Sequence, residues 1–145
     1  MAAIPSVELF FQCDMAGISG EWLTEKSIEA LPHCLEKPGT EEPALPSLEE
    51  VEVTLVNDET IARVHGEFMD DPTPTDVITF HHGEILVSVD TARSVAEEHG
   101  NSVTEETLLY IIHGFLHLNG HTDLSEPERA HMHRIQDDIL SRLKD

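Results

Sequence analysis

The spacing of apolar residues along the chain predicts short strands interleaved with amphipathic helices. Val51, Val53 and Leu55 alternate with polar residues, which is the pattern of a strand with one buried face. Near the C-terminus, apolar residues recur every three or four positions, which is the period of a helix with one buried face. In chain order we expect a strand at 7–12, a helix at 20–31, a strand at 51–55, a helix at 59–68, strands at 76–80 and 84–89, and three helices that end at 98, near 119 and at 143.

Prolines, glycines and capping residues set the expected boundaries of these elements. Ser19 can cap the first helix, and Pro32 is expected to end it because proline lacks the amide hydrogen that a helix interior needs. Three prolines and a glycine between residues 37 and 46 predict a loop. The expected N-caps of the later helices are Asn57 or Asp58, Asp90 or Thr91, and Thr104.

The predicted order of elements is β, α, β, α, β, β, α, α, α, which indicates an α+β fold. We expect residues 1–145 to form a single domain, because a chain of this length can bury one sizeable core. The domain should contain a small mixed sheet of about four strands packed with about five helices. Its third and fourth strands should form a hairpin around a His-His-Gly turn.

Charge and composition narrow the possible partners. The chain has 29 acidic and 8 basic residues, a formal net charge of −21, which repels polyanions unless positive charge is concentrated locally. No Lys or Arg occurs between Arg63 and Arg93, so the chain alone should bind nucleic acid weakly, and we expect no DNA partner. We also expect no membrane partner and a cytoplasmic location, because the sequence has neither a long apolar run nor a secretory signal.

The segment from Tyr110 to Asp123 carries the chemistry. His113 and His117 are four apart in a predicted helix, so both imidazoles can reach one ion. Gly120 can end that helix in a left-handed conformation and turn the chain back toward them. The sequence therefore predicts a metal site at the end of this helix.

Asp123 is the expected third ligand, because it occupies the position of the last histidine in an H-E-x-x-H-x-x-G-x-x-H zinc site. His121 is its competitor and would complete an all-nitrogen site. Three protein ligands to one Zn²⁺ leave a fourth position for water, whose pKa the ion would lower toward ~7. No catalytic group is assigned beyond that water, and the alternative is that His113 and His117 are only buried, hydrogen-bonded side chains.

From about Val51 onward the chain resembles the YbeY family of bacterial metal-dependent endoribonucleases. The family signature H-G-x-L-H-L-x-G-Y-D-H is matched at six of its nine fixed positions, from His113 to Gly120. The stretches P-T-D-V-I-T-F at 74–80 and G-E-I-L-V-S at 83–88 are also similar to family motifs. The resemblance implies zinc-dependent cleavage of RNA in the maturation of small-subunit ribosomal RNA and ribosome assembly, with that RNA and small-subunit proteins as partners.

The chain departs from the family pattern at functionally important positions. Asp123 replaces the third histidine ligand, and Met69 and Asp71 stand where the family usually has an Arg and a Lys. The expected contacts to phosphate are therefore missing, which weakens the prediction of RNA cleavage. The resemblance also implies a cleft beside the metal, and its possible lining residues are Thr75, Asp76, His81 and His82.

Two other functions remain open at this point. One is a ribosome-associated, non-catalytic factor whose metal stabilises the fold and whose acidic surface meets basic ribosomal proteins. The other is a metallohydrolase acting on peptides, although Gly114 stands where zinc proteases of the H-E-x-x-H type place their general base. His131 and His133 are two apart on the last predicted helix, so we do not expect them to share a metal.

Overall fold

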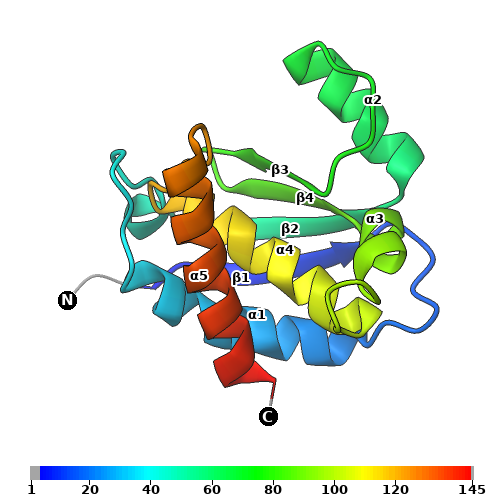
Figure 1. Cartoon of the computed structure of the whole chain (residues 1–145), viewed down its shortest axis with the longest axis horizontal. Coiled ribbons are helices and arrows are strands. Elements are labelled where there is room, and N and C mark those ends of the chain that lie inside the picture. Colours follow the sequence, from blue (N-terminus) through cyan, green and yellow to red (C-terminus); the bar gives the residue numbers. More distant parts are fainter. Residues whose placement is uncertain (1–3, 145) are drawn as a thin grey trace.

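The structure is a computed structural model that describes residues 4–144, and it contains one mixed sheet with five helices (Figure 1). The strands are β1 (Ser6–Phe11), β2 (Glu50–Val56), β3 (Val77–Phe80) and β4 (Glu84–Ser88). The helices are α1 (Gly20–Leu35), α2 (Asp58–Met69), α3 (Val89–Val95), α4 (Val103–Leu118) and α5 (Glu126–Leu143), and one short 3₁₀ turn spans Leu45–Ser47.

The four strands lie in the order β1-β2-β4-β3. β1, β2 and β4 are parallel to one another, and β3 pairs with β4 as an antiparallel hairpin. β2 therefore lies in the interior of the sheet, and its residues from Val53 to Val56 are all buried, as expected for a strand covered on both faces. The α+β fold, the mixed four-stranded sheet and the five helices predicted from the sequence are confirmed.

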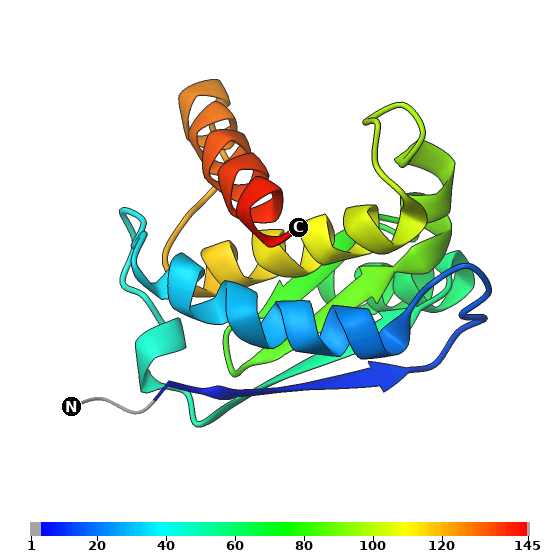
Figure 2. The same cartoon turned by 90° about the horizontal axis from the view of Figure 1, so that it is seen from below.

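The helices cover the two faces of the sheet unequally. α1 and α4 pack side by side on one face, and α5 lies outside them, against both helices and away from the strands (Figure 2). α2 covers part of the opposite face near β4. Within residues 4–144, no helix is long and apolar enough to cross a membrane. The larger core lies between the sheet and α4, whose fully buried residues include Leu108, Ile111, Ile112, Phe115 and Leu116.

Helix α1 is longer than predicted, because Pro32 lies inside it rather than at its end. The helix continues to Leu35, and Cys34 in its last turn is fully buried. Packing of Cys34 and Leu35 against the core offsets the single backbone hydrogen bond that Pro32 cannot donate. The expectation that Pro32 ends the helix was therefore wrong.

Two of the predicted helix caps are also wrong. Ser88, the last residue of β4, caps α3 through its hydroxyl, which accepts a hydrogen bond from the amide of Thr91. Ser102 caps α4 and forms a capping box with Glu105, so the helix begins before the predicted cap Thr104. In both cases a serine two or three residues before the predicted cap accepts the hydrogen bond from a free amide of the first turn. The predicted caps Ser19 and Asn57 are confirmed.

Candidate metal centre

The last turns of α4 carry His113 and His117 on one face of the helix. Between them, Gly114 allows α4 to approach the sheet closely, since a Cβ atom there would lie 2.9 Å from the side chain of Ile85 on β4. A larger residue at this position would push the helix off the strand. The glycine found where zinc proteases have a glutamate is therefore needed for packing.

After α4 the chain reverses and brings Asp123 back toward the two histidines. Gly120 makes this reversal with φ +94°, the left-handed conformation expected from the sequence. A Cβ atom on Gly120 would lie 2.4 Å from the carbonyl oxygen of Glu41, so the neighbouring loop also requires a glycine here. The turn that delivers the carboxylate thus depends on one residue that has no side chain.

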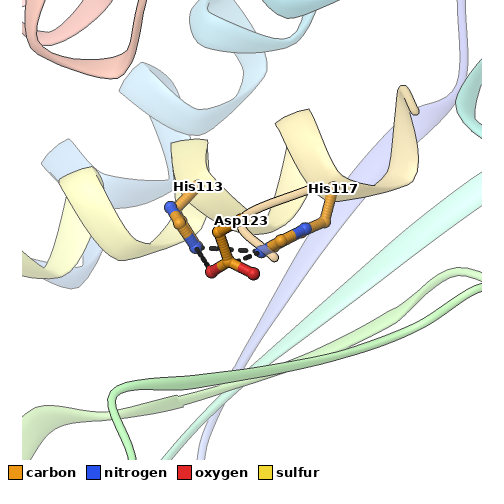
Figure 3. A group of neighbouring side chains, drawn as sticks. All are labelled: His113, His117 and Asp123. Atoms are coloured by element: carbon orange, nitrogen blue, oxygen red, sulfur yellow. Dashed lines mark hydrogen bonds and ion pairs between the residues drawn. The ribbon is translucent and has the colours of Figure 1, made fainter. Parts of the chain in front are cut away.

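His113, His117 and Asp123 meet at a single point (Figure 3). The two Nε2 atoms are 3.0 Å apart, and Oδ2 of Asp123 lies 3.7 Å from Nε2 of His113 and 3.6 Å from Nε2 of His117. The imidazole rings are nearly perpendicular, at 84°. Among residues 4–144, these side chains form the one group of His, Cys, Asp or Glu whose ligand atoms could hold an ion.

The opposite nitrogens of both rings are fixed by hydrogen bonds. Nδ1 of His117 lies 3.0 Å from the carbonyl oxygen of His121, which can only accept, so this nitrogen carries the proton. Nδ1 of His113 lies 2.7 Å from Oε1 of Gln136 on α5. Such partners orient metal-binding imidazoles and leave Nε2 with a free lone pair.

This donor set fits a metal ion. With Nδ1–H donating in both rings, the two Nε2 lone pairs face each other at 3.0 Å, which is unfavourable unless a cation lies between them. Ligand atoms about 2.05 Å from a tetrahedral zinc ion are about 3.3 Å apart, close to the spacings found here. Two imidazole nitrogens and one carboxylate oxygen are also a combination that zinc accepts.

Electrostatics in the group favour an ionised carboxylate. The interaction with His113, and secondarily the nearby His117, lowers the pKa of Asp123 to about 2 despite partial burial. Burial opposes charge on His113, but its interactions with Asp123 and Gln136 outweigh that effect and raise its pKa. Burial and the neighbouring His113 lower the pKa of His117. The site is therefore a negatively charged oxygen beside two imidazoles, a favourable environment for a cation.

A segment from the first third of the chain braces the end of α4. Residues 39–44, which we call the strap, donate three backbone hydrogen bonds to α4 and the turn after it. The amide of Gly39 donates to the carbonyl oxygen of Asn119 at 2.9 Å, and the amide of Glu41 donates to that of Gly120 at 3.0 Å. The amide of Ala44 donates to the carbonyl oxygen of Leu118 at 2.8 Å. These bonds satisfy carbonyl groups that a helix end otherwise leaves free. The predicted loop is thus a structural support for the site.

His121, the predicted competitor of Asp123, is not among the side chains whose ligand atoms converge. Its side chain is buried, and its Nε2 lies 2.5 Å from the carbonyl oxygen of Lys37 at the start of the loop. Its ring lies next to that of His131 on α5. His121 therefore helps to hold the loop, while its own carbonyl group orients His117. The arrangement favours Asp123 over His121 as a ligand.

Three of the four predicted cleft residues line two pockets that adjoin the group of His113, His117 and Asp123. His81 lines a pocket of about 360 Å³ together with His117, Asp123 and Met69. Thr75 and Asp76 line a second pocket, of about 340 Å³, that reaches His113. His82 lies elsewhere, stacked on Phe80 with ring centroids 5.7 Å apart, and lines neither pocket.

The two positions where the family's basic pair was expected lie beside or outside the site. Met69 lies at the end of α2, is 48% exposed and lines the pocket next to Asp123. Asp71 lies two residues later, and its carboxylate accepts hydrogen bonds from the amide and hydroxyl of Thr73. Among residues 4–144, no Lys or Arg lines either of the two pockets that flank the metal group.

Sequence reasoning missed the residues that support the centre from a distance. Gln136 carried no signal, because its contact with His113 depends on how α5 packs on α4. His133 was considered only as a partner of His131 in a metal site, whereas its ring lies 6.5 Å from that of His113, centroid to centroid. The strap was predicted only as a loop. Each depends on contacts between segments far apart in the sequence.

Comparison with known proteins assigns the chain to a family. Residues 19–144 match the family described as Endoribonuclease YbeY. A protein of that name from Bacillus licheniformis is 38% identical over 112 residues, which cover 64% of this chain and 71% of the relative. Another, from Heliobacterium modesticaldum, is 31% identical over 92% of this chain and 94% of its own length.

The fold also has a counterpart among solved structures. The solution structure of a Thermotoga maritima protein is similar with a TM-score of 0.60 and 25% sequence identity. The match covers 94% of this chain and 89% of the other. The arrangement of sheet and helices is therefore shared over nearly the whole length of both proteins.

Proposed function

Because this chain belongs to the YbeY family of endoribonucleases, we propose that it cleaves RNA with the help of one zinc ion held by His113, His117 and Asp123. Its proposed substrate is a precursor of small-subunit ribosomal RNA, and its setting is ribosome assembly in the cytoplasm. Its proposed partners are that RNA and proteins of the small subunit. The nuclease class follows from the family, and the metal and the substrate are our proposals.

The observation that carries this proposal is the convergence of two imidazole nitrogens and one carboxylate oxygen. His113 and His117 are 13% and 22% exposed, whereas Asp123 is 42% exposed. The group therefore faces solvent on the side of the carboxylate, where a substrate can approach. A purely structural zinc site would instead have four protein ligands and no open position.

Each residue of the centre has a separate task in this proposal. His113 and His117 would hold the ion through Nε2, and Gln136 and the carbonyl group of His121 keep both rings in the required orientation. Asp123 would complete the site and neutralise part of its charge. When bound, zinc supplies Lewis acidity for phosphodiester hydrolysis and makes water a stronger acid.

Metal analysis and a cleavage assay test the proposal together. Purified protein should contain close to one zinc ion per chain, and should cut a precursor of small-subunit ribosomal RNA. A chelator should stop cleavage, and added zinc should restore it. Protein that holds zinc but cuts no such precursor would contradict the proposed activity.

The lack of Lys and Arg around the centre favours one alternative, a metal-stabilised protein that binds basic ribosomal proteins without cutting RNA. His117→Ala separates the two functions. An enzyme should lose cleavage while its partners remain bound, whereas an adaptor should lose thermal stability and partner binding together. Pull-down of small-subunit proteins alongside a thermal melt makes this comparison.

A further inference from the structure

The pocket next to His113 is lined by two acidic residues and, among the described residues, by no Lys or Arg that could hold a phosphate. It has a volume of about 340 Å³, within the range of small-ligand sites, and we call it the α5 pocket. Its polar lining includes Thr75, Asp76, His99, Tyr110, His133 and Gln136. A second pocket of about 420 Å³ shares His99, His133 and Gln136 with it, so the lining of the two is continuous along α5.

One wall of the α5 pocket is a fixed network around a buried carboxylate. Glu106 on α4 is fully buried, and its two oxygens are 2.8 Å from Nδ1 of His99 and 3.0 Å from Nδ2 of Asn101. These hydrogen bonds give partners to polar atoms that would otherwise be costly to bury. The wall is therefore preorganised, and it presents an acidic interior rather than a basic one.

Asp76, another lining residue of the α5 pocket, offers a free hydrogen-bond acceptor. Asp76 is half-buried, and within residues 4–144 only its Oδ1 accepts hydrogen bonds, from the amide of Val77 and the hydroxyl of Thr75. Its Oδ2 remains available to a ligand. Together with the buried Glu106, this carboxylate repels phosphate, and no Lys or Arg among the described residues lines the pocket to compensate.

The ring of His133 completes the pocket. Its side chain is exposed on α5, and its ring centroid lies 6.5 Å from that of His113 with the planes at 63°. A planar group entering beside His113 can therefore lie against this ring. Aromatic and imidazole rings are the surfaces on which single-stranded RNA bases stack.

We propose that the α5 pocket receives one nucleobase of the RNA substrate, and that it prefers a base with an exocyclic amino group. This inference rests on the proposed function, because it assumes that the substrate is an RNA strand lying across the metal centre. The base would stack on His133, and its amino group would donate to Oδ2 of Asp76. Adenine, cytosine and guanine carry such a donor, whereas uracil has a carbonyl oxygen at the corresponding position.

The lack of Lys and Arg around the centre supports binding of the RNA through a base rather than through its phosphates. Phosphate contacts from Lys and Arg usually dominate affinity for RNA, but the pockets flanking this centre have none among residues 4–144. Contacts to a base do not require positive charge. A strand held by one base next to the metal group would still place a neighbouring phosphodiester near His113 and Asp123.

Free nucleosides test the pocket without relying on cleavage. Adenosine, cytidine and uridine are titrated separately into zinc-loaded protein, and the ring resonances of His133 are followed by NMR. Adenosine and cytidine should shift them in a saturable way, and uridine should shift them much less. The absence of any saturable shift, or an equal response to uridine, would overturn the proposal.

A pair of histidines on the same helix provides the matched variants. His133→Ala should weaken binding of short oligoadenylate and oligocytidylate roughly tenfold, within the range for loss of a base-stacking side chain. His131→Ala, whose ring lies beside His121 instead, should leave that binding unchanged. Equal effects of the two substitutions would contradict the pocket.

Asp76→Asn tests the choice of base. An asparagine keeps a carbonyl acceptor for the amide of Val77 and adds an amide NH2 donor, so oligouridylate should gain affinity relative to oligoadenylate. An unchanged order of affinities would remove Asp76 from the proposal. Circular dichroism and zinc content of each variant confirm that fold and metal centre are intact.

These outcomes are distinguishable from those that test the proposed function. If zinc-loaded protein cuts RNA, but its binding depends neither on the base nor on His133, the pocket proposal fails and the proposed function stands. If nucleosides bind with the expected preference but no RNA is cut, the function fails and the pocket stands.

Discussion

Helices α4 and α5 pack against each other and carry two histidines each, but only the pair on α4 converges. His113 and His117 are four residues apart, one helical turn, and their Nε2 atoms are 3.0 Å apart. His131 and His133 are two apart, so one ring lies beside His121 and the other beside His113. The two histidines of α4 therefore form part of one candidate metal site, whereas those of α5 lie apart on the surface.

Burial adds to the effect of spacing. Most residues of α4 are buried, since it lies between the sheet and α5, whereas α5 buries only one stripe. The histidines of α4 are consequently held by fixed neighbours, Gln136 and the carbonyl group of His121. Those of α5 project from an exposed face. A metal centre thus requires both the right interval and a rigid, partly buried surrounding.

The largest expected effect is the loss of stabilisation by zinc when one histidine of the α4 pair is replaced. In wild-type protein, free zinc at about 100 times its Kd should add about 2.7 kcal/mol to the free energy of unfolding. His113→Ala should abolish this gain, because two ligands remain. Calorimetric melts with and without zinc measure it, with His131→Ala as the control that keeps the full gain. If zinc stabilised neither variant, the histidines of α4 and α5 would not differ in their contribution to zinc binding.

A second prediction concerns the ligand supplied after the turn. Asp123→Ala should weaken zinc binding by more than the roughly 10–100-fold that loss of a supporting partner costs, because it removes a ligand itself. Asp123→His should restore binding, since it recreates the ligand of the family signature. Competition with a chromophoric chelator measures both affinities. Zinc binding unaffected by Asp123→Ala would exclude the carboxylate from the site.

The contact between the two helices can be tested at Gln136. Gln136→Leu removes the acceptor behind His113 and should lower zinc affinity roughly 10–100-fold. Gln136→Glu keeps an acceptor and should retain most of the affinity. Asp138→Asn, on an exposed position of α5, is the control. A leucine variant that binds zinc like wild type would show that α5 does not support the centre.

The smallest effect probes the burial of α4 directly. Burial, and then the carboxylate of Glu106, raise the pKa of Tyr110 above its ordinary value near 10. The unfolded chain releases this proton at lower pH than the folded one, so the free energy of unfolding should fall as the pH rises above about 10. Tyr110 is the sole tyrosine, so phenolate absorbance reports it alone. Titration at the ordinary value in folded protein would contradict the burial.

Much of this fold could be predicted from local patterns. Alternation in β2 and the helical period of α5 depend on which residues face the core, and both predictions were confirmed. The interval between His113 and His117 and the turn at Gly120 are also local, so the structure has them where the sequence indicated. Features that depend only on residues within about a dozen positions of one another can therefore be predicted from the sequence.

The errors have a common physical origin in packing and in competition between neighbours. Pro32 stays within α1 because burial at the helix end outweighs a local preference. Ser88 and Ser102 act as caps where nearby residues had equal propensity. The contact between Gln136 and His113 joins residues 23 apart, and no pattern within either helix encodes it.

The strap joins a segment that is synthesised early to one that is synthesised much later. Its amides leave the ribosome early, but the carbonyl groups that they bind belong to Leu118, Asn119 and Gly120, near the other end of the chain. Gln136 is made later still. Nascent chains that end before α5 therefore lack Gln136, and we expect the proposed site to reach its full zinc affinity only after α5 has been made.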